Sequence, residues 1–445
     1  MAAAAEAWGV PGQVLALVET AARDTANRIG QALIQHVLAE PAGPASASAA
    51  CGQGHPARNT GMRPVSVRTA LGPVRLERSW WHCDTCHAGF APTESFYGIS
   101  PAHTSAGYDK ILSLTGAEHP YQSSAGLIAE LTGVDLAPAS SVNRVTRRVG
   151  AAARRRLDTE TAAIRAGTLT MLPPPGPAPD ICYVLVDGTG APMVPKETRG
   201  RPGKGPDGRS HTREVKIGCL FTQNQPGRPG QPPVRDDASV SYLSTFEPAD
   251  GFAAQLKTEW DRRRFDLIRQ PVVIGDGAKW IWNIADRLFP EAAHIVDYWH
   301  ACEHLCDLVK IFDHILSDPA AFTDQLIDHL DHGDIGAITD QIDTLKLAGY
   351  KGRLAEKTSN ALAYFTGNAH RMQYQHYRTM GWFIGSGPVE AACKTIVAQR
   401  AKQAGMRWTL AGLDPILAIR TTTRSARDHL IWGNDPSQTT PNTAA

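Results

Sequence analysis

The sequence predicts an α/β protein in which a mixed β-sheet carries acidic side chains at one edge. Asp187 ends the hydrophobic run Tyr-Val-Leu-Val, and Asp276 ends the run Pro-Val-Val-Ile-Gly. Glu390 opens a later helix after Gly-Ser-Gly-Pro-Val. Carboxylates in a buried sheet avoid the cost of desolvation by reaching solvent or a cation, and converging carboxylate oxygens suit Mg²⁺. The three acids therefore predict a metal site of the kind that serves phosphoryl transfer.

The order of the elements supports this interpretation more than any single acid does. Taken alone, an Asp-Gly pair after a hydrophobic run is most often a turn, and an acid in the first turn of a helix complements the helix dipole. Between the two aspartates, however, we expect strands near residues 214–221 and 239–246 and a helix near 250–266. Two aspartates on strands and a later glutamate on a helix is the layout of an RNase H-like core, with its first part at 180–302 and its C-terminal helices at 385–432.

Residues 1–50 are expected to form an N-terminal helix and a linker. The helix, at about 11–39, has amphipathic spacing at Val14 and Leu17, and a Pro/Ala/Ser-rich stretch follows it. We interpret it as a packing or oligomerisation helix.

Residues 51–100 are predicted to form a zinc-ribbon-like domain. A C-x-x-C knuckle and an earlier Cys/His cluster flank two alternating strands, at 63–68 and 72–80. A hairpin of this size has too small a core to hold itself together, and ligands that close a tetrahedron around Zn²⁺ would stabilise it. The alternative is a metal-free hairpin with unpaired thiols. The predicted structural zinc ligands are Cys51, His55, Cys83 and Cys86, with His82 and His87 as alternatives for the fourth position.

Residues 101–170 are predicted to form a helical DNA-binding region. A short helix at 123–133 ends in glycine, and a second helix at 140–156 is rich in arginine. Helix, short turn and basic helix favour a helix-turn-helix, with an ordinary helical hairpin as the competing interpretation. A Pro-rich linker at 172–180 sets the boundary with the core. The predicted DNA contacts on the second helix are Arg144, Arg147 and Arg148.

A second basic segment lies within the core. From Lys196 to Lys216 there are seven Lys or Arg residues and three acidic ones, in a Gly/Pro-rich loop. Basic side chains clustered in this way are typical of DNA contacts, although a solvated loop is the simpler alternative. The predicted contacts here and after the last acid are Arg201, Lys204, Arg209 and Lys394.

Five separated motifs also resemble a known family. The chain is similar, from about residue 50 to 430, to the DDE transposases of bacterial insertion sequences of the Kra type, relatives of the Mutator-like superfamily. The motifs occur in the family's order and are Val186–Met193, Arg213–Gly218, Gly275–Trp282, Asp297–His300 and Gly385–Glu390.

The resemblance implies a function and its site. Asp187, Asp276 and Glu390 would be the catalytic residues that hold two Mg²⁺ or Mn²⁺ ions, with Asp297 and His300 as auxiliary residues of a D-x-x-H element. The implied reaction is cleavage and strand transfer of double-stranded DNA, at the element's terminal inverted repeats and at a target, by a homodimer or higher oligomer. The family also places a helical insertion before the last acid, here at 303–384, and residues 433–445 are expected to be a disordered tail.

Two other functions compete with this one. His300-Ala-Cys-Glu303-His304 fits the H-x-x-E-H pattern of inverted zinc metallopeptidases, in which two histidines one helical turn apart bind Zn²⁺. That interpretation leaves the three core acids without a role. The other alternative is a non-catalytic, transposase-derived DNA-binding protein, which is disfavoured because all three acids are present.

Composition is compatible with these predictions. The chain has 445 residues and a formal net charge of +1, so the distribution of charge matters more than its sum. No stretch reaches the roughly 20 apolar residues of a membrane helix. The N-terminus lacks a basic segment typical of secretory signals, so we expect a cytoplasmic, nucleoid-associated protein. Its eight cysteines are then thiols or metal ligands.

Overall fold

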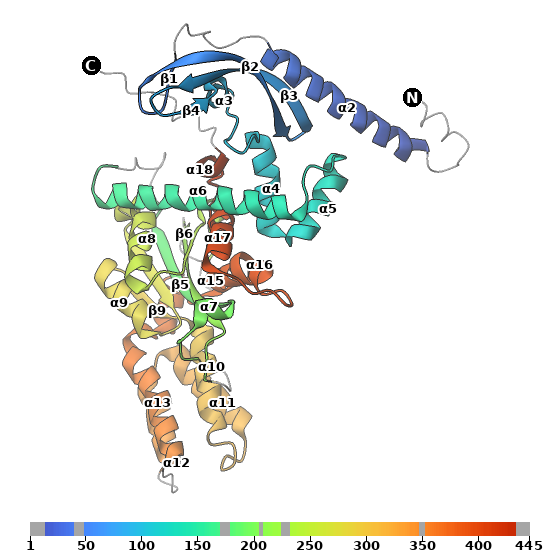
Figure 1. Ribbon diagram of the computed structural model, residues 1–445. Helices are drawn as coiled ribbons and strands as arrows, with labels where there is room; N and C mark the ends of the chain where they lie inside the picture. The colour runs from blue at the N-terminus through green and yellow to red at the C-terminus, as the bar shows by residue number, and fades with distance from the viewer. Residues whose placement is uncertain are drawn as a thin grey trace. The chain divides into compact units, whose positions relative to one another are not determined.

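The computed structural model describes residues 14–39, 49–169, 179–203, 208–223, 232–346 and 352–432 (Figure 1). The chain divides into two compact units. The first comprises Met1–Ala153 and Asp428–Ala445, and the second comprises Arg154–Arg427. Each unit mixes helices and strands, as the sequence predicts.

The first unit contains an antiparallel sheet with the strand order β1-β2-β3-β4. Alternating side chains on its two long strands fill a core made of Val65, Val67, Val74 and Leu76. This period of two is what a half-buried sheet requires. The strands are β1 (Ala49–Ala50), β2 (Pro56–Thr69), β3 (Gly72–Cys83) and β4 (Ala88–Phe90), and the long helix α2 (Val14–Ala39) packs on β3.

Helices make up the rest of this unit. They are α3 (Pro92–Phe96), α4 (Ala106–Glu118), α5 (Tyr121–Thr132), α18 (His429–Trp432) and the first part of α6 (Ala139–Arg165), whose residues from Arg154 on belong to the second unit. Gly133 ends α5 in the left-handed conformation, at φ 69°. The sequence predicted the second basic helix only as far as residue 156, whereas α6 reaches Arg165 because neither Gly nor Pro occurs between residue 156 and Gly167.

The second unit is built on a five-stranded mixed sheet with the order β7-β6-β5-β8-β9. β6 pairs antiparallel with β5 and β7, while β5, β8 and β9 run parallel. This is the strand order of an RNase H-like fold, which confirms the predicted fold class. The strands are β5 (Ile181–Pro192), β6 (Thr212–Gln223), β7 (Ser241–Thr245), β8 (Gln270–Gly275) and β9 (Ala293–Val296).

Helices flank this sheet and extend from it (Figure 1). α8 (Ala249–Arg262) and α9 (Lys279–Leu288) pack on each other and on its strands. α15 (Gly387–Ala392) packs on β5 and β6, and α17 (Leu410–Arg424) on β7. Between α15 and α17 lie the π-helix η5 (Cys393–Ala398) and α16 (Gln399–Ala401).

A helical insertion separates β9 from α15, as predicted. Its helices are α10 (Tyr298–Lys310), α11 (Pro319–His332), α12 (Ile335–Lys346), α13 (Arg353–Asn368) and α14 (Tyr374–Thr379). Short helices complete the unit: α7 (Pro195–Thr198), η2 (Asp237–Ser239), η3 (Phe265–Leu267) and η4 (Ala369–Arg371). In the described part of the chain, no helix is long and apolar enough to cross a membrane.

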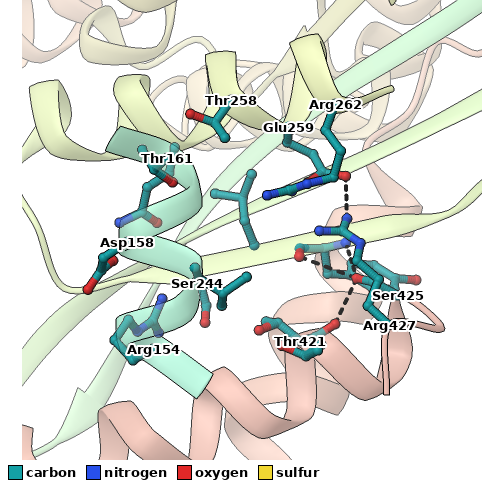
Figure 2. A pocket seen from close by; sticks show the side chains of 15 residues that line it. Arg154, Asp158, Thr161, Ser244, Thr258, Glu259, Arg262, Thr421, Ser425 and Arg427 are labelled. Carbon is teal, nitrogen blue, oxygen red and sulfur yellow. Dashed lines mark hydrogen bonds and ion pairs between the residues drawn. The ribbon is translucent and has the colours of Figure 1, made fainter. Parts of the chain in front are cut away.

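A buried charge cluster holds helices of the second unit together around a polar cavity of about 40 Å³ (Figure 2). Glu259 of α8 forms ion pairs with Arg262 and Arg427. Burial alone would raise the pKa of Glu259, but the charges of these two arginines and of Arg263 lower it to about 2. The carboxylate therefore stays ionised inside the fold.

Candidate functional site

Asp187 lies inside β5 rather than at its end, which corrects the sequence prediction. β5 continues to Pro192 because β6 pairs with it antiparallel as far as Thr212. Its parallel pairing with β8 ends earlier, at the pair Leu185 and Ile274. Asp187 is therefore two residues past the end of the parallel ladder, on the edge that β8 leaves open.

Asp276 directly follows β8, as the sequence predicts. Its Oδ1 accepts a hydrogen bond from the Ala278 N–H at 2.8 Å. Gly277 between them has φ +95°, a conformation that favours glycine. Because β5 and β8 are adjacent and parallel, the carboxylates of Asp187 and Asp276 lie at the same edge of the sheet.

Glu390 lies in the first turn of α15, the helix that packs on β5 and β6. Its Oε1 accepts a hydrogen bond from the Ser386 hydroxyl at 2.8 Å. The structure thus brings an acid from a segment far along the chain to the strand that carries Asp187.

The pKa of Asp187 depends on the charges of the other two acids. Burial raises the pKa of Asp187, and the negative charges of Asp276 and Glu390 raise it further. Hydrogen bonds from the Cys393 thiol at 3.2 Å and from the Gly188 N–H at 2.6 Å act in the opposite direction. Asp276 and Glu390 therefore lie close enough for their charges to act on Asp187, while burial is the largest cause of its raised pKa.

Cys393 is a site residue that sequence reasoning missed. It is the first residue of the π-helix η5, and its side chain is buried. Burial and the neighbouring charge of Asp187 raise the pKa of this thiol well above its ordinary value. Cys393 is therefore a protonated donor to Asp187, which a helical pattern in the sequence could not reveal.

Asp297 of the D-x-x-H element ties two segments together. It is fully buried at the N-terminus of α10, where its Oδ1 accepts a hydrogen bond from the His300 N–H at 2.8 Å. Its Oδ2 accepts a second one from the Ser386 N–H. Asp297 thus links the end of β9 to the residue that hydrogen-bonds Glu390.

Tyr364 of the helical insertion contacts the loop after β8 and was also missed. Its hydroxyl donates to the Asp276 carbonyl at 3.1 Å, and its ring stacks on His304 at 4.0 Å between centroids. Burial is the main cause that lowers the pKa of His304.

The structure places no third zinc ligand with the histidines of the H-x-x-E-H motif among the described residues. The His300 and His304 rings lie 5.9 Å apart, and Glu303 lies 3.8 Å from the nearer nitrogen of His300. Within the described residues, neither this pair nor the three core acids belong to a group of three or more His, Cys, Asp or Glu side chains whose ligand atoms already lie close enough to share an ion. A catalytic zinc site needs three protein ligands, and the H-x-x-E-H element offers only its two histidines here.

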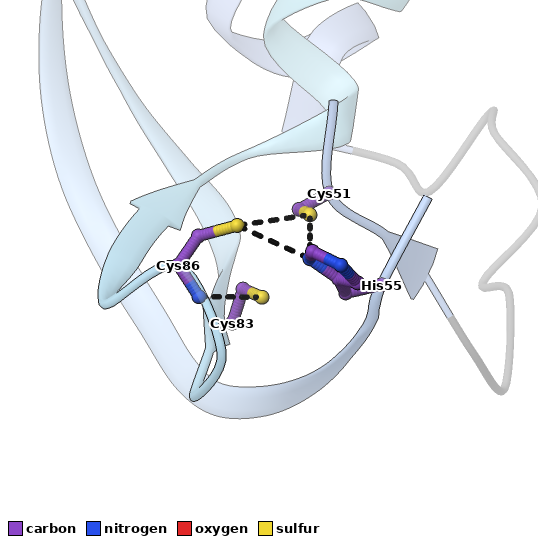
Figure 3. A group of neighbouring side chains, drawn as sticks. All are labelled: Cys51, His55, Cys83 and Cys86. Carbon is purple, nitrogen blue, oxygen red and sulfur yellow. Dashed lines mark hydrogen bonds between the residues drawn. The ribbon is translucent and has the colours of Figure 1, made fainter. Parts of the chain in front are cut away.

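One group within the described residues does have that geometry, and it lies in the first unit (Figure 3). The ligand atoms of Cys51, His55, Cys83 and Cys86 all lie within 4.8 Å of one another. The Sγ atoms of Cys51 and Cys86 are 3.8 Å apart, and Cys86 Sγ is 3.2 Å from His55 Nδ1. Zn–S bonds of about 2.3 Å place two sulfurs of a tetrahedron about 3.8 Å apart. The cluster is consistent with structural zinc, with His55 as the fourth ligand.

The thiols of this cluster differ in acidity. A backbone hydrogen bond at Gln53 is the main cause that lowers the pKa of Cys51 to about 6, although burial opposes it. Burial and the neighbouring thiols raise the pKa of Cys86 to about 11. Cys51 therefore forms the thiolate, which is the form that binds a metal, more readily than Cys86 does.

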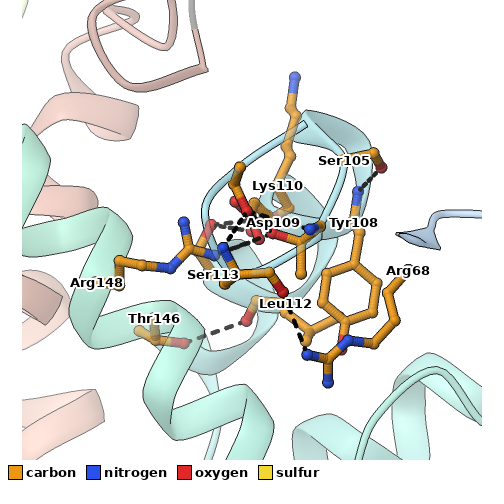
Figure 4. A network of polar contacts seen from close by, with 12 residues as sticks. Arg68, Ser105, Tyr108, Asp109, Lys110, Leu112, Ser113, Thr146 and Arg148 are labelled. Atoms are coloured by element: carbon orange, nitrogen blue, oxygen red, sulfur yellow. Dashed lines mark hydrogen bonds and ion pairs between the residues drawn. The ribbon is translucent and has the colours of Figure 1, made fainter. Parts of the chain in front are cut away.

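The predicted DNA contacts on α6 separate into two kinds. Arg144 and Arg147 are exposed. Arg148 instead forms an ion pair with Asp109 of α4 at 2.6 Å and a hydrogen bond with Thr104 at 3.3 Å (Figure 4). Arg148 is therefore part of the packing between α4 and α6, which the spacing of arginines along the sequence could not distinguish.

In the second unit, Arg201, Arg209 and Lys394 are exposed, and Lys204 lies outside the described residues. Arg400, six residues after Lys394, is instead fully buried with its guanidinium 4.9 Å from the centroid of the Trp408 ring. That arginine belongs to the core.

Comparisons with known proteins are sparse. No family model matches the chain, and no curated protein matches it. Among solved structures, it is similar to the Drosophila P element transposase strand transfer complex, at 8% sequence identity and a TM-score of 0.23. The match covers 77% of this chain and 84% of that one. A likeness this distant carries nothing about activity.

Proposed function

We propose that the chain is a DNA transposase, a polynucleotidyl transferase of the DDE type. The observation that carries the proposal is the position of Asp187 and Asp276 at one edge of two adjacent parallel strands, with Glu390 close enough to raise the pKa of Asp187. The motifs shared with transposases of bacterial insertion sequences support the same assignment.

The donor set suits Mg²⁺ or Mn²⁺. Asp187, Asp276 and Glu390 offer only carboxylate oxygens, the ligands that hard cations prefer. Cys393 serves the site as a donor to Asp187, and we do not propose it as a ligand. Cations at this edge would compensate the charge of Asp187, whose pKa is raised by burial and by the two neighbouring carboxylates. When bound, two such ions would activate a water or a 3′-hydroxyl and stabilise the leaving oxygen in an in-line displacement.

The chain's own residues hold the acids in place. Cys393 donates to Asp187 and thereby orients its carboxylate. Ser386 holds Glu390, and Asp297 in turn holds the Ser386 backbone. Tyr364 fixes the carbonyl of Asp276 from the insertion. The insertion thus acts on the geometry of the site, and we assign Asp297 a positioning role, while His300 stays an auxiliary residue.

The substrate we propose is double-stranded DNA at the ends of a mobile element, joined to a target by a homodimer or higher oligomer. In the first unit, Arg144 and Arg147 of α6 are placed to contact phosphates or base edges, since their side chains are exposed.

Cleavage of DNA tests the proposal. The substrate would be duplexes that carry the two ends of the DNA segment encoding this chain, with Mg²⁺ supplied. We expect strand cleavage by the native chain, and its loss in Asp276→Asn and Glu390→Gln with DNA binding retained. Glu303→Gln is the matched control, because Glu303 is an exposed acid of α10, and it should cleave like the native chain. Full cleavage by Asp276→Asn, or none by the native chain, would contradict the assignment.

A further inference from the structure

A basic cleft lies in the second unit, apart from the three acids. Its volume is about 810 Å³, and it opens where the loop after α7, the segment before β6 and the segment before α17 meet. No Asp or Glu of the described chain lines it. The basic side chains that line it are Arg199, Arg201, Arg209, His211 and Arg407.

Backbone hydrogen bonds hold the walls of this cleft in place. The Val194 N–H donates to the Trp408 carbonyl at 2.9 Å, and the Trp408 N–H donates to the Pro192 carbonyl at 3.1 Å. These bonds fix the segment that carries Arg407 against the end of β5. The Ser210 N–H donates to the Arg201 carbonyl at 3.1 Å, which fixes the other wall.

A glycine permits the close approach of the two loop segments. A Cβ at Gly203 would lie 2.3 Å from the carbonyl oxygen of Arg209, closer than any real contact. The described segments 199–203 and 208–211 are thus held together through their backbones, and the exposed Arg201 and Arg209 lie on them.

Two described acids beside the cleft are engaged elsewhere. The Glu197 carboxylate accepts a hydrogen bond from the Leu410 N–H at 3.2 Å, and Glu214 forms an ion pair with Lys216 at 2.6 Å. Arg199, Arg201 and Arg407 are exposed on the described lining, which contains no Asp or Glu. Arginine side chains arranged in this way suit phosphate oxygens, which they contact through paired N–H groups.

We propose that this cleft binds the phosphodiester backbone of the DNA that the carboxylate site cleaves, an inference that rests on the proposed function. The cleft begins at Met193, six residues beyond Asp187 along the same extended strand. At about 3.3 Å per residue this is about 20 Å, and a DNA strand carries a phosphate every 3.4 Å or so. The cleft would therefore hold phosphates about six nucleotides from the bond that is cleaved.

The proposed role of the cleft is tested by measuring how the affinity for DNA depends on salt. EDTA is present so that no cleavage occurs during the measurement. The variant R199A/R201A/R407A removes three exposed guanidinium groups. We expect the slope of log affinity against log salt to fall by about 2.7, so that the affinity lost between 50 and 200 mM salt becomes about 40-fold smaller. The triple Arg→Lys variant should keep most of the slope. Arg269→Ala is the matched control, since Arg269 is 82% exposed and precedes β8 at the end opposite Asp276.

The outcomes separate the two proposals. If the triple alanine variant keeps the native salt slope while the native chain cleaves DNA, the cleft does not bind the DNA backbone, and the proposed function stands. If the native chain shows no salt-dependent binding to duplex DNA, both fail. A folding defect in the alanine variant would lower its midpoint of thermal unfolding. In that case the proposal is judged by the Arg→Lys variant, which should keep most of the native salt slope. Ethylation of phosphates about six nucleotides from the cleaved bond should weaken binding by the native chain and leave the alanine variant unaffected.

Discussion

Glu259→Gln should destabilise the second unit strongly. The substitution keeps the shape of the side chain but removes the charge that Arg262 and Arg427 face in the interior. The side chain of Arg427 is 14% exposed, and a guanidinium stays protonated even when burial lowers its pKa. The variant would therefore leave Arg427 largely desolvated without its counter-charge, a costly change, while Arg262 keeps its ion pair with Glu160.

The magnitude follows from the pKa of Glu259. It falls from an ordinary 4.5 to about 2 in the folded chain. At about 1.4 kcal/mol for each pKa unit, ionisation of this carboxyl stabilises the fold by about 3 kcal/mol at pH 7. Because the folded pKa is the lower one, this stabilisation is complete above pH 4.5 and is lost as the pH falls through about 2. At pH 3 less than half of it should remain.

Urea unfolding at pH 7 and pH 3 measures this difference, with the second unit followed by hydrogen exchange of peptides from α8. The gap between native and variant chains should shrink at the lower pH. Asp250→Asn is a suitable control, since Asp250 is an exposed acid of the same helix whose ion pair with Arg287 should contribute less than about 1 kcal/mol. Equal stability of native and Glu259→Gln chains at pH 7, or a gap that does not change with pH, would refute the reasoning.

Two further predictions concern the first unit. Cys83→Ser should release zinc and loosen residues 51–90, whereas His87→Ala should keep one zinc per chain by elemental analysis, because His87 is not among the four clustered ligands. Native protein that lacks zinc under reducing conditions would contradict this. Ala at both Arg144 and Arg147 should reduce the salt slope of DNA binding by about 2, or flatten the preference for element ends over random DNA if they read bases. If neither changes, α5 and α6 form a structural hairpin.

The sequence predicted those features that depend on local patterns. The strand near 214–221, the helix near 250–266 and the acid after β8 all follow from hydrophobic runs and their ends. The full length of β5 did not, since its second half is a strand only because β6 pairs with it. Gly and Thr at 188–190 do not form a strand by propensity alone.

Contacts between segments that are distant along the chain could not be predicted from the sequence either. Cys393 lies 206 residues from Asp187, and Tyr364 lies 88 residues from Asp276. Arg148 has the same sequence context as Arg147, yet only Arg148 meets an acid from another helix. In each case the partner is set by packing, which a one-dimensional pattern does not contain.

The surroundings of the buried acids separate structural from functional roles. Glu259 is surrounded by arginines, and Asp297 accepts two backbone N–H groups. Both are satisfied by the chain itself. Asp187 is half-buried, it has a thiol and one N–H as donors, and the charges of two other carboxylates act on it. A carboxylate whose pKa is raised by burial and by other acids is costly to the fold unless a cation compensates it. This difference is why we propose Asp187, and not Glu259 or Asp297, as a metal ligand.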